Sequence, residues 1–562
     1  MVDNRTSFIK WMRAFAEVLL IYVVFLAVTQ TQFVLTETSL RIGLLFAFMA
    51  VLATRWFIKR AKLVFIFLPT YFLFLPILNN AVIELTGQFV TPRTEVPFQY
   101  VAQIIGETSV NEIFEFFSSY GVTVLYYLVL YVFGIWLMYR VQWFFHQRYV
   151  TQLASSGIST FPHKKLKKWS FVVIVSVVLS SPLLINASVL PYLAHGTYHL
   201  LEEREAFLRF QTSNQEHVNE YFARHPVTIL DDQPNTLVLV VGESLNRDDM
   251  GIYGYSRETT PNLRVLHDRG ELYRHQNSYS TAASTVRSLR HALTLSKYGD
   301  DDWYKTPTLL QVVKEAGYKI YWLSNQQTYG NHDSPMTWIA AAADVKRFVN
   351  ARGYFVPSYD EILLPHLNEA LADPARKKLI VLHTLGSHFK YKNRYDERFK
   401  IYDEISDSVT AEMHKLQRSE DVIKLRSEYD NSVVYTDYFL SQVIGSLKKQ
   451  SNNTQLLFFS DHGEDVGHDL NRHGHSESTL SGFKIPLLIW MDENYRQHNW
   501  ASLQANMNKP FTLDMLPYTV FDLLHIQVAN GKEKRSLFSE SYQVNQEAMI
   551  AGKKILTIAT NH

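Results

Sequence analysis

The chain has 562 residues, of which 47% are hydrophobic and 19% are charged, and its net charge at pH 7 is +1. A chain of this length exceeds what one hydrophobic core usually fills, so we expect two domains. Because the sequence contains no cysteine, disulfides and thiolate metal sites are excluded.

Apolar stretches dominate the N-terminal part of the chain, and five of them have the length that crosses a bilayer, which takes about 20 residues. The first is not a cleaved signal, because four more follow it and it lacks a clean small-residue cleavage site. We therefore expect a bundle of five transmembrane helices. The stretches are approximately Ala14–Thr29, Leu40–Phe57, Val64–Leu85, Gly121–Met138 and Trp169–Leu190.

Charged residues between these stretches predict their orientation. Lys and Arg cluster before the first stretch and in the second and fourth loops, which places those faces in the cytoplasm. The loop of residues 87–119 carries four glutamates against Arg93 alone, so we expect it outside. An odd number of spans places the C-terminal part outside as well.

The remaining boundaries follow from composition. Within the outer loop, Phe98–Phe117 has apolar residues at helical spacing; it either lies on the membrane as two amphipathic helices or caps the bundle. We assign residues 1–195 to the transmembrane domain, 196–232 to a charged bridging helix and linker, and 233–562 to an outer domain.

The outer domain alternates short apolar segments with amphipathic ones, which favours an α/β fold with a mostly parallel sheet. Polar clusters follow three of the predicted strands, at Glu243, His383–His388 and Asp461-His462. In open α/β sheets, ligands gather at the carboxyl ends of the strands. The predicted strands are Thr236–Val241, Lys319–Ser324, Lys378–His383, Gln455–Phe459 and Ile485–Trp490.

The stretch Gln455–His475 has the strongest chemical pattern, because a buried strand ends in Asp461-His462 and His468, His473 and His475 follow. Carboxylate and imidazole ligands suit Zn²⁺ or Mn²⁺. Glu243, Asp461 and His462 together make a site with three protein ligands. Catalytic zinc sites keep the fourth position for a reacting oxygen.

We expect the oxygen that fills the fourth position of the metal to come from a residue between Ser280 and Leu295, where a small polar turn precedes a helical stretch. A hydroxyl at the start of this helix would be activated by the metal while backbone N–H groups receive a phosphate. Thr281, Ser284 and Thr285 are the candidates, and Thr281 and Ser284 fit simple N-capping better than chemistry. The local pattern alone does not choose among them.

These residues resemble a known family, the phosphoethanolamine transferases of the Gram-negative inner membrane, within the alkaline phosphatase and sulfatase superfamily. The resemblance covers nearly the whole chain, five spans included, and implies an α/β sulfatase-like catalytic domain in the periplasm. The matching segments are Val241–Ser244, Gly251–Tyr255, Thr259–Pro261, Thr285–Thr294, Trp322–Gln327, His383–Tyr395, Tyr429–Ser432 and Ser460–Glu464.

The resemblance implies roles for individual residues. The zinc ligands fall on Glu243, Asp461 and His462, and the threonine nucleophile that also touches zinc falls on Thr285. Further matching positions bind substrate: His388 and His473 hold the phosphate or a second metal, and Thr108 and Glu112 face the donor headgroup. Two features differ from the members that modify lipid A. Those members have Asn at the position of Ile104, and many of them carry disulfides, which this chain without cysteine lacks. The chain is therefore more similar to the subgroup that acts on core sugars of lipopolysaccharide.

The implied activity is transfer of phosphoethanolamine from phosphatidylethanolamine to a lipopolysaccharide acceptor, with a core heptose favoured, through a zinc-activated threonine and a covalent intermediate. Zn²⁺ is the expected cofactor in preference to Mn²⁺. We expect membrane lipids as further partners and no binding of nucleic acid. The protein is expected in the inner membrane with a cytoplasmic N-terminus.

Other activities share parts of this pattern. Transfer to the lipid A phosphate or another envelope glycan uses the same residues, and so does plain hydrolysis with water as acceptor. A glycerol-phosphate transferase of the lipoteichoic acid type has the same layout but lacks the matching segments. A non-catalytic envelope-binding protein would be expected to lose ligands that this chain keeps.

Overall fold

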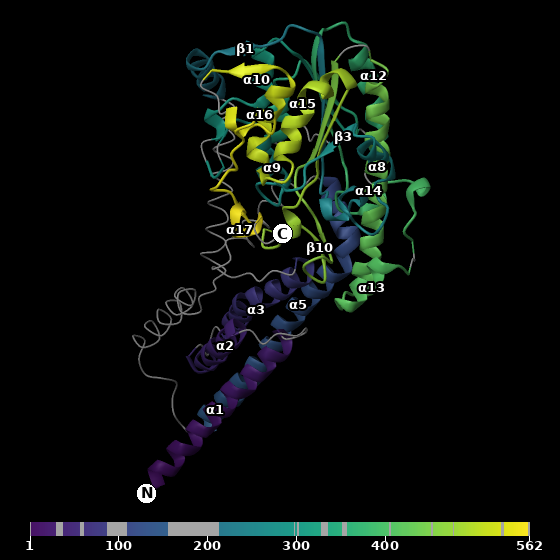
Figure 1. Ribbon diagram of the computed structural model, residues 1–562. Helices are drawn as coiled ribbons and strands as arrows, with labels where there is room; N and C mark the ends of the chain where they lie inside the picture. The colour runs from purple at the N-terminus through teal and green to yellow at the C-terminus, as the bar shows by residue number, and fades with distance from the viewer. Residues whose placement is uncertain are drawn as a thin grey trace. The chain divides into compact units, whose positions relative to one another are not determined.

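The computed structural model divides into two compact units, Met1–Thr108 with Phe116–Leu201, and Ser109–Glu115 with Glu202–His562 (Figure 1). The described residues are 2–29, 37–56, 61–86, 110–155, 213–296, 298–300, 303–326, 335–350, 357–403, 406–450, 453–475, 477–529 and 533–559.

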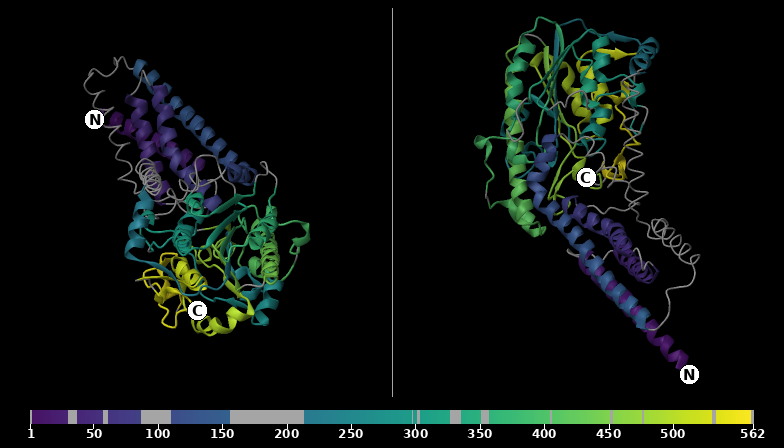
Figure 2. Two further views of the ribbon diagram at one scale, coloured as in Figure 1. Left: turned by 90° about the horizontal axis from the view of Figure 1, so that it is seen from above. Right: turned by 180° about the vertical axis from the view of Figure 1, so that it is seen from behind.

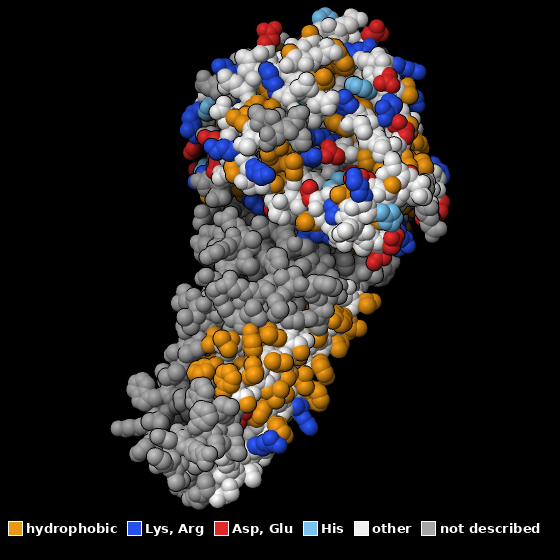
Figure 3. All heavy atoms as spheres, turned by 60° about the horizontal axis from the view of Figure 1, so that its bottom comes forward, with side chains coloured by type: hydrophobic (Ala, Val, Ile, Leu, Met, Phe, Trp, Pro, Cys, Tyr) orange, Lys and Arg blue, Asp and Glu red, His pale blue; other side chains and the backbone are white. Residues whose placement is uncertain are grey.

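Long helices make up the described part of the N-terminal unit. Its core is aromatic: the ring of Phe46 lies 5.1 Å from that of Phe25 and 5.7 Å from that of Phe72. Apolar side chains such as Phe67 and Leu125 are exposed. Hydrophobic side chains gather on the visible face of the described helices of this unit (Figure 3). The helices are α1 (Val2–Thr29), α2 (Glu37–Trp56), α3 (Ala61–Thr86) and α5 (Val110–Ser155).

The first, third and fourth predicted spans lie in α1, α3 and α5, and the second lies in α2 as far as Trp56. The fifth, at residues 169–190, lies outside the described residues. Among the described helices, Gly121–Gln152 is long and apolar enough to cross a membrane, while Phe15–Thr29 and Lys62–Phe74 are shorter apolar helices. Five spans therefore stay a prediction. Helix α5 begins at Val110, inside the predicted outer loop of residues 87–119, and the bounds of that loop stay a prediction.

The C-terminal unit is built on a seven-stranded sheet with the order β3-β11-β8-β2-β7-β5-β6. All five predicted strands are present, but the sheet is mixed, because β11 runs antiparallel to β8 and β3. A parallel return would need a crossover, usually a helix. The described part of residues 461–486 contains no α-helix, only a short 3₁₀ helix at Leu480–Gly482. The strands are β2 (Asn235–Gly242), β3 (Leu272–Arg274), β5 (Lys319–Ser324), β6 (Val345–Phe348), β7 (Lys377–His383), β8 (Asn453–Ser460) and β11 (Leu487–Met491).

Helices cover both faces of the sheet, giving three layers (Figures 1 and 2). Alternation along β2 explains this, since Leu237 and Leu239 face one apolar core and Val238 and Val240 face the other. The first core includes residues of α9 (Thr285–Ala292), α10 (Leu309–Glu315), α11 (Pro335–Ala340), α15 (Glu493–Asn506) and α16 (Leu516–Leu523). The second includes residues of α8 (Pro261–Asp268), α12 (Leu364–Ala372) and α14 (Glu420–Leu447).

Smaller elements complete this unit. They are β1 (Val227–Ile229) with β13 (Ile526–Val528), β4 (Ser278–Tyr279) with β12 (Phe511–Thr512), β9 (Asp465–Val466) with β10 (His473–Gly474), β14 (Met549–Ile550) with β15 (Lys553–Lys554), and the helices α13 (Ser408–Lys415) and α17 (Ile555–Ala559).

Candidate active site and metal centre

Two neighbouring parallel strands deliver the predicted ligands to one edge of the sheet. In the register of β2 and β8, Gly242 pairs with Ser460. The residues that follow, Glu243 on one strand and Asp461 on the other, therefore leave the sheet side by side. This explains why positions more than 200 residues apart meet.

The structure brings Glu243, Asp461, His462 and Thr285 together. His462 Nε2 lies 3.4 Å from Glu243 Oε1 and 3.5 Å from Asp461 Oδ2. Thr285 Oγ1 lies 3.3 and 3.4 Å from the two carboxylate oxygens of Glu243 and 3.4 Å from His462 Nε2. The two carboxylates and the imidazole are at most 2% exposed.

The backbone around Glu243 is held tightly. Ser244 has φ of 55°, the left-handed region that non-glycine residues seldom adopt. In this conformation its N–H donates to Asp461 Oδ1 at 3.0 Å and its hydroxyl donates to Glu243 Oε1 at 2.9 Å. Gly386 packs on the same backbone, since a Cβ there would meet the Glu243 carbonyl oxygen at 2.7 Å. The Ser387 N–H donates to that carbonyl at 2.9 Å.

Thr285 is the first residue of α9, and Ser284 occupies the N-cap position. Contrary to the expectation of simple capping, the Ser284 side chain makes no cap hydrogen bond, and its buried Oγ has no hydrogen-bond partner among the described residues. Thr281 Oγ1 instead lies 3.1 Å from His291 Nδ1. One turn further along α9, the Ser288 hydroxyl donates to the Asp461 carbonyl at 2.5 Å, which ties the helix to the metal-ligand turn.

Electrostatics at this cluster favour a cation. Burial and then the charge of Glu243 raise the pKa of Asp461 to about 8. Burial would lower the pKa of His462, but the charges of Asp461 and Glu243 raise it to about 10. Burial would likewise raise the pKa of Glu243, yet the hydrogen bond with His462 and the charges of His388 and His462 hold it low. Two buried carboxylates thus compete for one imidazolium, and a metal ion would relieve this competition.

The donor set also fits a metal. Glu243, Asp461 and His462 each offer one ligand atom, and these atoms lie within 4.8 Å of one another. The Oδ2 atom of Asp461 is buried and accepts no hydrogen bond from any described residue. Three N/O ligands with a hydroxyl beside them match the ligand count of a catalytic zinc site.

The two histidines predicted to bind substrate, His388 and His473, have different surroundings. His388 lies close enough to Glu243 for its charge to lower the pKa of that carboxyl. His473 stacks on Phe389 with ring centroids 5.0 Å apart, and its Nδ1 lies 3.5 Å from the Tyr391 hydroxyl. Burial lowers the pKa of His473 to about 4, so its imidazole is neutral. Of the headgroup positions, Thr108 and Ile104 lie outside the described residues, and Glu112 lies in α5 without a described side chain.

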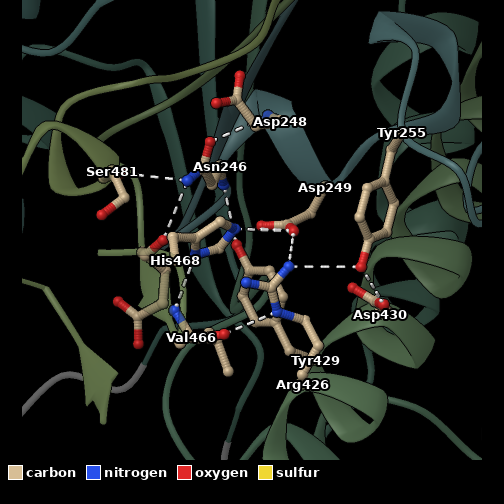
Figure 4. Close-up of polar contacts among 12 residues, drawn as sticks. Asn246, Asp248, Asp249, Tyr255, Arg426, Tyr429, Asp430, Val466, His468 and Ser481 are labelled. Atoms are coloured by element: carbon tan, nitrogen blue, oxygen red, sulfur yellow. Dashed lines mark hydrogen bonds and ion pairs between the residues drawn. The ribbon is translucent and has the colours of Figure 1, made fainter. Parts of the chain in front are cut away.

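His468 contacts Asp249 and is not in either group of potential metal ligands among the described residues. Its Nδ1 accepts a hydrogen bond from the Val466 N–H at 3.0 Å, and its Nε2 lies 2.9 Å from Asp249 Oδ1 (Figure 4). Arg426 donates to the same Asp249 oxygen at 2.6 Å and to the Val466 carbonyl at 2.7 Å. This buried network joins α14, the loop after β2 and strand β9.

Sequence reasoning missed that Glu464 belongs beside the ligands. His462, Glu464 and His475 form a second group whose ligand atoms lie within 4.8 Å of one another. The signal is the hairpin of β9 and β10, which pairs Val466 with His473 and Asp465 with Gly474. Two-residue strands are too short to stand out in a sequence.

Known proteins resemble this chain in the same region. The phosphoethanolamine transferase EptC of Escherichia coli (strain K12) is 32% identical over 337 residues, which are 58% of this chain and 58% of the relative. The C-terminal periplasmic domain of E. coli EptC, solved in complex with Zn, matches with a TM-score of 0.54 and 32% identity over 57% of this chain and 91% of that one.

The match to the integral membrane protein EptA of Neisseria meningitidis covers 97% of this chain and 98% of that one, with a TM-score of 0.55 and 18% identity, and so describes the fold. Residues 235–526 match the family model described as Sulfatase. This region is more than half of the 562 residues and contains all four clustered side chains, and the chain belongs to the sulfatase family.

Proposed function

We propose that this protein transfers phosphoethanolamine from phosphatidylethanolamine to a lipopolysaccharide acceptor through a covalent intermediate on Thr285. The observation that carries the proposal is the position of Thr285 Oγ1, 3.3 Å from Glu243 Oε1 and 3.4 Å from His462 Nε2 at the start of α9. The identity to proteins named phosphoethanolamine transferases supports the choice of the transferred group.

The reaction has two displacements. Thr285 Oγ1 attacks the phosphorus of the donor, the bond from phosphorus to the diacylglycerol oxygen breaks, and that oxygen takes up the proton that Thr285 loses. A hydroxyl of the acceptor then attacks the same phosphorus, the bond to Thr285 Oγ1 breaks, and the proton of the acceptor returns to Thr285. Zinc held by Glu243, Asp461 and His462 would supply a Lewis acid that favours the ionised hydroxyl and offsets the charge developing at phosphorus. The zinc-bound structure of the E. coli domain supports the choice of metal.

Two histidines are assigned different roles, proton transfer for His473 and phosphate binding for His388. His473, whose imidazole is neutral because its pKa is lowered to about 4, is suited to take the proton of the acceptor hydroxyl in the second displacement. Tyr391 supports this placement: its hydroxyl contacts His473 Nδ1 and also donates to Glu464 Oε1 at 2.5 Å, two residues from His462. His388, close to Glu243, is assigned to the substrate phosphate. Thr108 and Glu112 are proposed to meet the donor headgroup.

Intact-mass analysis tests the covalent step. Wild-type protein incubated with phosphatidylethanolamine alone should gain one phosphoethanolamine, and peptide mapping should place it on Thr285. Thr285→Ala should gain nothing and transfer nothing. An adduct on Thr281 or Ser284 would move the nucleophile, and an active Thr285→Ala protein without an adduct would end the covalent proposal.

The acceptor requires a separate experiment. Given labelled donor and whole lipopolysaccharide, the wild type should place the label on a core heptose, which fragment mass spectra distinguish from the lipid A phosphate. Release of free phosphoethanolamine with unlabelled lipopolysaccharide would identify a hydrolase instead.

We also propose that the protein resides in the inner membrane with five spans and a periplasmic catalytic unit. The apolar helix Gly121–Gln152 and the exposed apolar side chains of the N-terminal unit support a membrane location. Lysine-specific labelling from outside intact spheroplasts should reach Lys415 and miss the lysines at 164–168. The opposite labelling pattern would reverse the orientation.

A further inference from the structure

The loop that follows β7, residues 384–389, connects two parts of the proposed active site. Its glycine, Gly386, packs on the backbone of Glu243, and the Ser387 N–H donates to the Glu243 carbonyl at 2.9 Å. The next residue is His388, which is assigned to the substrate phosphate. Any shift of this loop would therefore displace a metal ligand and a phosphate-binding side chain together.

A buried carboxylate holds the first half of the loop. Asp360 is 4% exposed, and its two oxygens accept the N–H groups of Leu385 at 2.8 Å and Gly386 at 3.0 Å. The positive φ of Gly386, 50°, suits a turn in which two successive N–H groups converge on one anion. Asn325 Nδ2 donates to Asp360 Oδ1 at 2.9 Å, and the Ser358 hydroxyl donates to Asn325 Oδ1 at 2.7 Å. The carboxylate is thus oriented before it meets the loop.

A buried guanidinium holds the second half of the loop. Arg394 is 6% exposed, and it donates from Nε to the His388 carbonyl at 3.0 Å and from Nη2 to the Phe389 carbonyl at 2.8 Å. Burial raises the pKa of Asp360, while the hydrogen bonds that it accepts and the charge of Arg394 oppose this rise. Two opposite buried charges are therefore directed at one short stretch of backbone.

This use of charge favours precision over stability. Burying a charge is costly, and well-packed apolar residues often stabilise a fold as well as a buried ionic group does. Hydrogen bonds to an ionised group are roughly twice as strong as neutral ones, so they fix the atoms that they join more firmly. In this loop those atoms are the backbone of Leu385, Gly386, His388 and Phe389.

We propose that Asp360 and Arg394 are positioning residues of the active site. Asp360 holds Gly386 and Ser387 against the backbone of the metal ligand Glu243, and Arg394 holds the backbone of His388. Neither residue needs to touch substrate or metal for this role. The inference rests on the proposed function for the part that concerns His388, whereas the part that concerns Glu243 depends only on the metal site.

Asp437 offers a matched control for Asp360. It is 0% exposed and accepts two successive N–H groups, from Asn262 at 3.0 Å and from Leu263 at 2.8 Å. It also accepts one side-chain amide, from Asn262 Nδ2 at 2.7 Å. These groups belong to α8 and not to the loop after β7. Asp360→Asn and Asp437→Asn therefore remove the same charge from the same kind of contact at two different places.

Zinc competition and donor kinetics on full-length protein in detergent test the proposal. Zinc retention is measured against a graded chelator, and initial transfer rates are measured against phosphatidylethanolamine concentration, both at a temperature where melting curves show every variant folded. Asp360→Asn should weaken zinc binding and raise KM for the donor, each by about tenfold, the lower end of the usual cost of losing an outer-shell partner. Asp437→Asn should lower the melting temperature by a similar amount and keep the wild-type zinc affinity and KM.

Arg394→Lys is the second variant, because it keeps the charge but loses the planar fork that reaches two carbonyls. It should raise KM for the donor more than it weakens zinc binding, since its contacts lie at the His388 end of the loop.

Equal zinc affinity and KM in Asp360→Asn and Asp437→Asn, whether both unchanged or both impaired, would overturn the proposal. If Asp360→Asn does not fold, Arg394→Lys decides, and a wild-type KM in that variant would overturn it. If the wild type transfers nothing, the proposed function fails, and the zinc affinities of the two Asp→Asn variants still decide whether Asp360 positions Glu243.

Discussion

The hydroxyl oxygen of Thr285 lies 3.4 Å from Nε2 of His462, although the two residues are 177 positions apart and belong to different elements. Thr285 begins α9, whereas His462 follows β8. The Ser288 hydroxyl, which donates to the Asp461 carbonyl, holds α9 against the turn that carries His462. The relationship therefore depends on one side-chain hydrogen bond as well as on the sheet.

Thr285 should matter far more for transfer than for metal binding. Thr285→Ala removes one neutral oxygen, while Asp461→Asn removes a charged ligand. We expect Thr285→Ala to retain about one zinc per chain without transfer activity. Asp461→Asn should weaken zinc binding by about a hundredfold or more, beyond the cost of losing an outer-shell partner. Elemental analysis after dialysis against a weak chelator measures both. Equal zinc loss in the two variants would contradict the ligand assignment.

Gly386→Ala should disturb the metal centre from outside it. A Cβ at this position would meet the backbone of Glu243 at 2.7 and 2.8 Å, so either the glutamate or the loop must move. We expect a loss of about 1–3 kcal/mol in unfolding free energy and weaker zinc binding. Gly317→Ala is the matched control, because Gly317 also has positive φ, 82°, but its Cβ would meet no atom within 4 Å. If both variants bind zinc like the wild type, the contact does not position Glu243.

The buried pair of Arg426 and Asp249 should show a strong coupling energy. Their side chains are 6% and 0% exposed, and the atoms lie 2.6 Å apart. Arg426→Met leaves Asp249 with a weaker partner in His468, and we expect a loss of about 3–5 kcal/mol. The double variant with Asp249→Asn should recover much of this loss. Chemical unfolding of the four proteins gives the coupling energy, and additive effects would exclude it.

His275 should make the catalytic unit sensitive to acid. Its Nε2 donates to the Lys509 carbonyl at 2.8 Å and its Nδ1 accepts from the Tyr273 hydroxyl at 3.0 Å, an arrangement that only the neutral ring can make. Burial lowers its pKa from 6.5 to about 3. Since the unfolded chain takes up the proton below pH 6.5, stability is complete above that pH and declines below it. The expected slope is about 1.4 kcal/mol for each pH unit.

The variant His275→Gln supplies an acceptor and a donor that do not titrate. Its melting temperature should fall less steeply than that of the wild type between pH 6.5 and pH 4.5. The exposed His498, replaced by Gln, serves as the control and should keep the wild-type slope. A slope in His275→Gln equal to that of the wild type would assign the acid sensitivity to other groups.

Glu243, Asp461 and His462 could be predicted as neighbours from the sequence because each follows a short apolar run. Parallel strands end at the same edge of a sheet, so polar residues placed directly after them meet whatever the rest of the chain does. Thr285 was within reach of the same reasoning, since a small polar turn before a helical pattern marks a helix start. Choosing it over Thr281 and Ser284 required the resemblance to a family.

Only the tertiary structure decided the direction of β11 and the partners of the histidines, because strand pairing and contacts between distant segments leave no local pattern in the sequence. Ile485–Trp490 reads as a buried strand in either direction, and its antiparallel course follows from a connection without a crossover helix. His468, His473 and His475 are equivalent in the sequence, but the register of a hairpin with two-residue strands turns His475 towards Glu464 and His473 towards Tyr391, while His468 meets Asp249. Composition and periodicity report burial one residue at a time, whereas a polar contact between distant segments exists only once both backbones are in place.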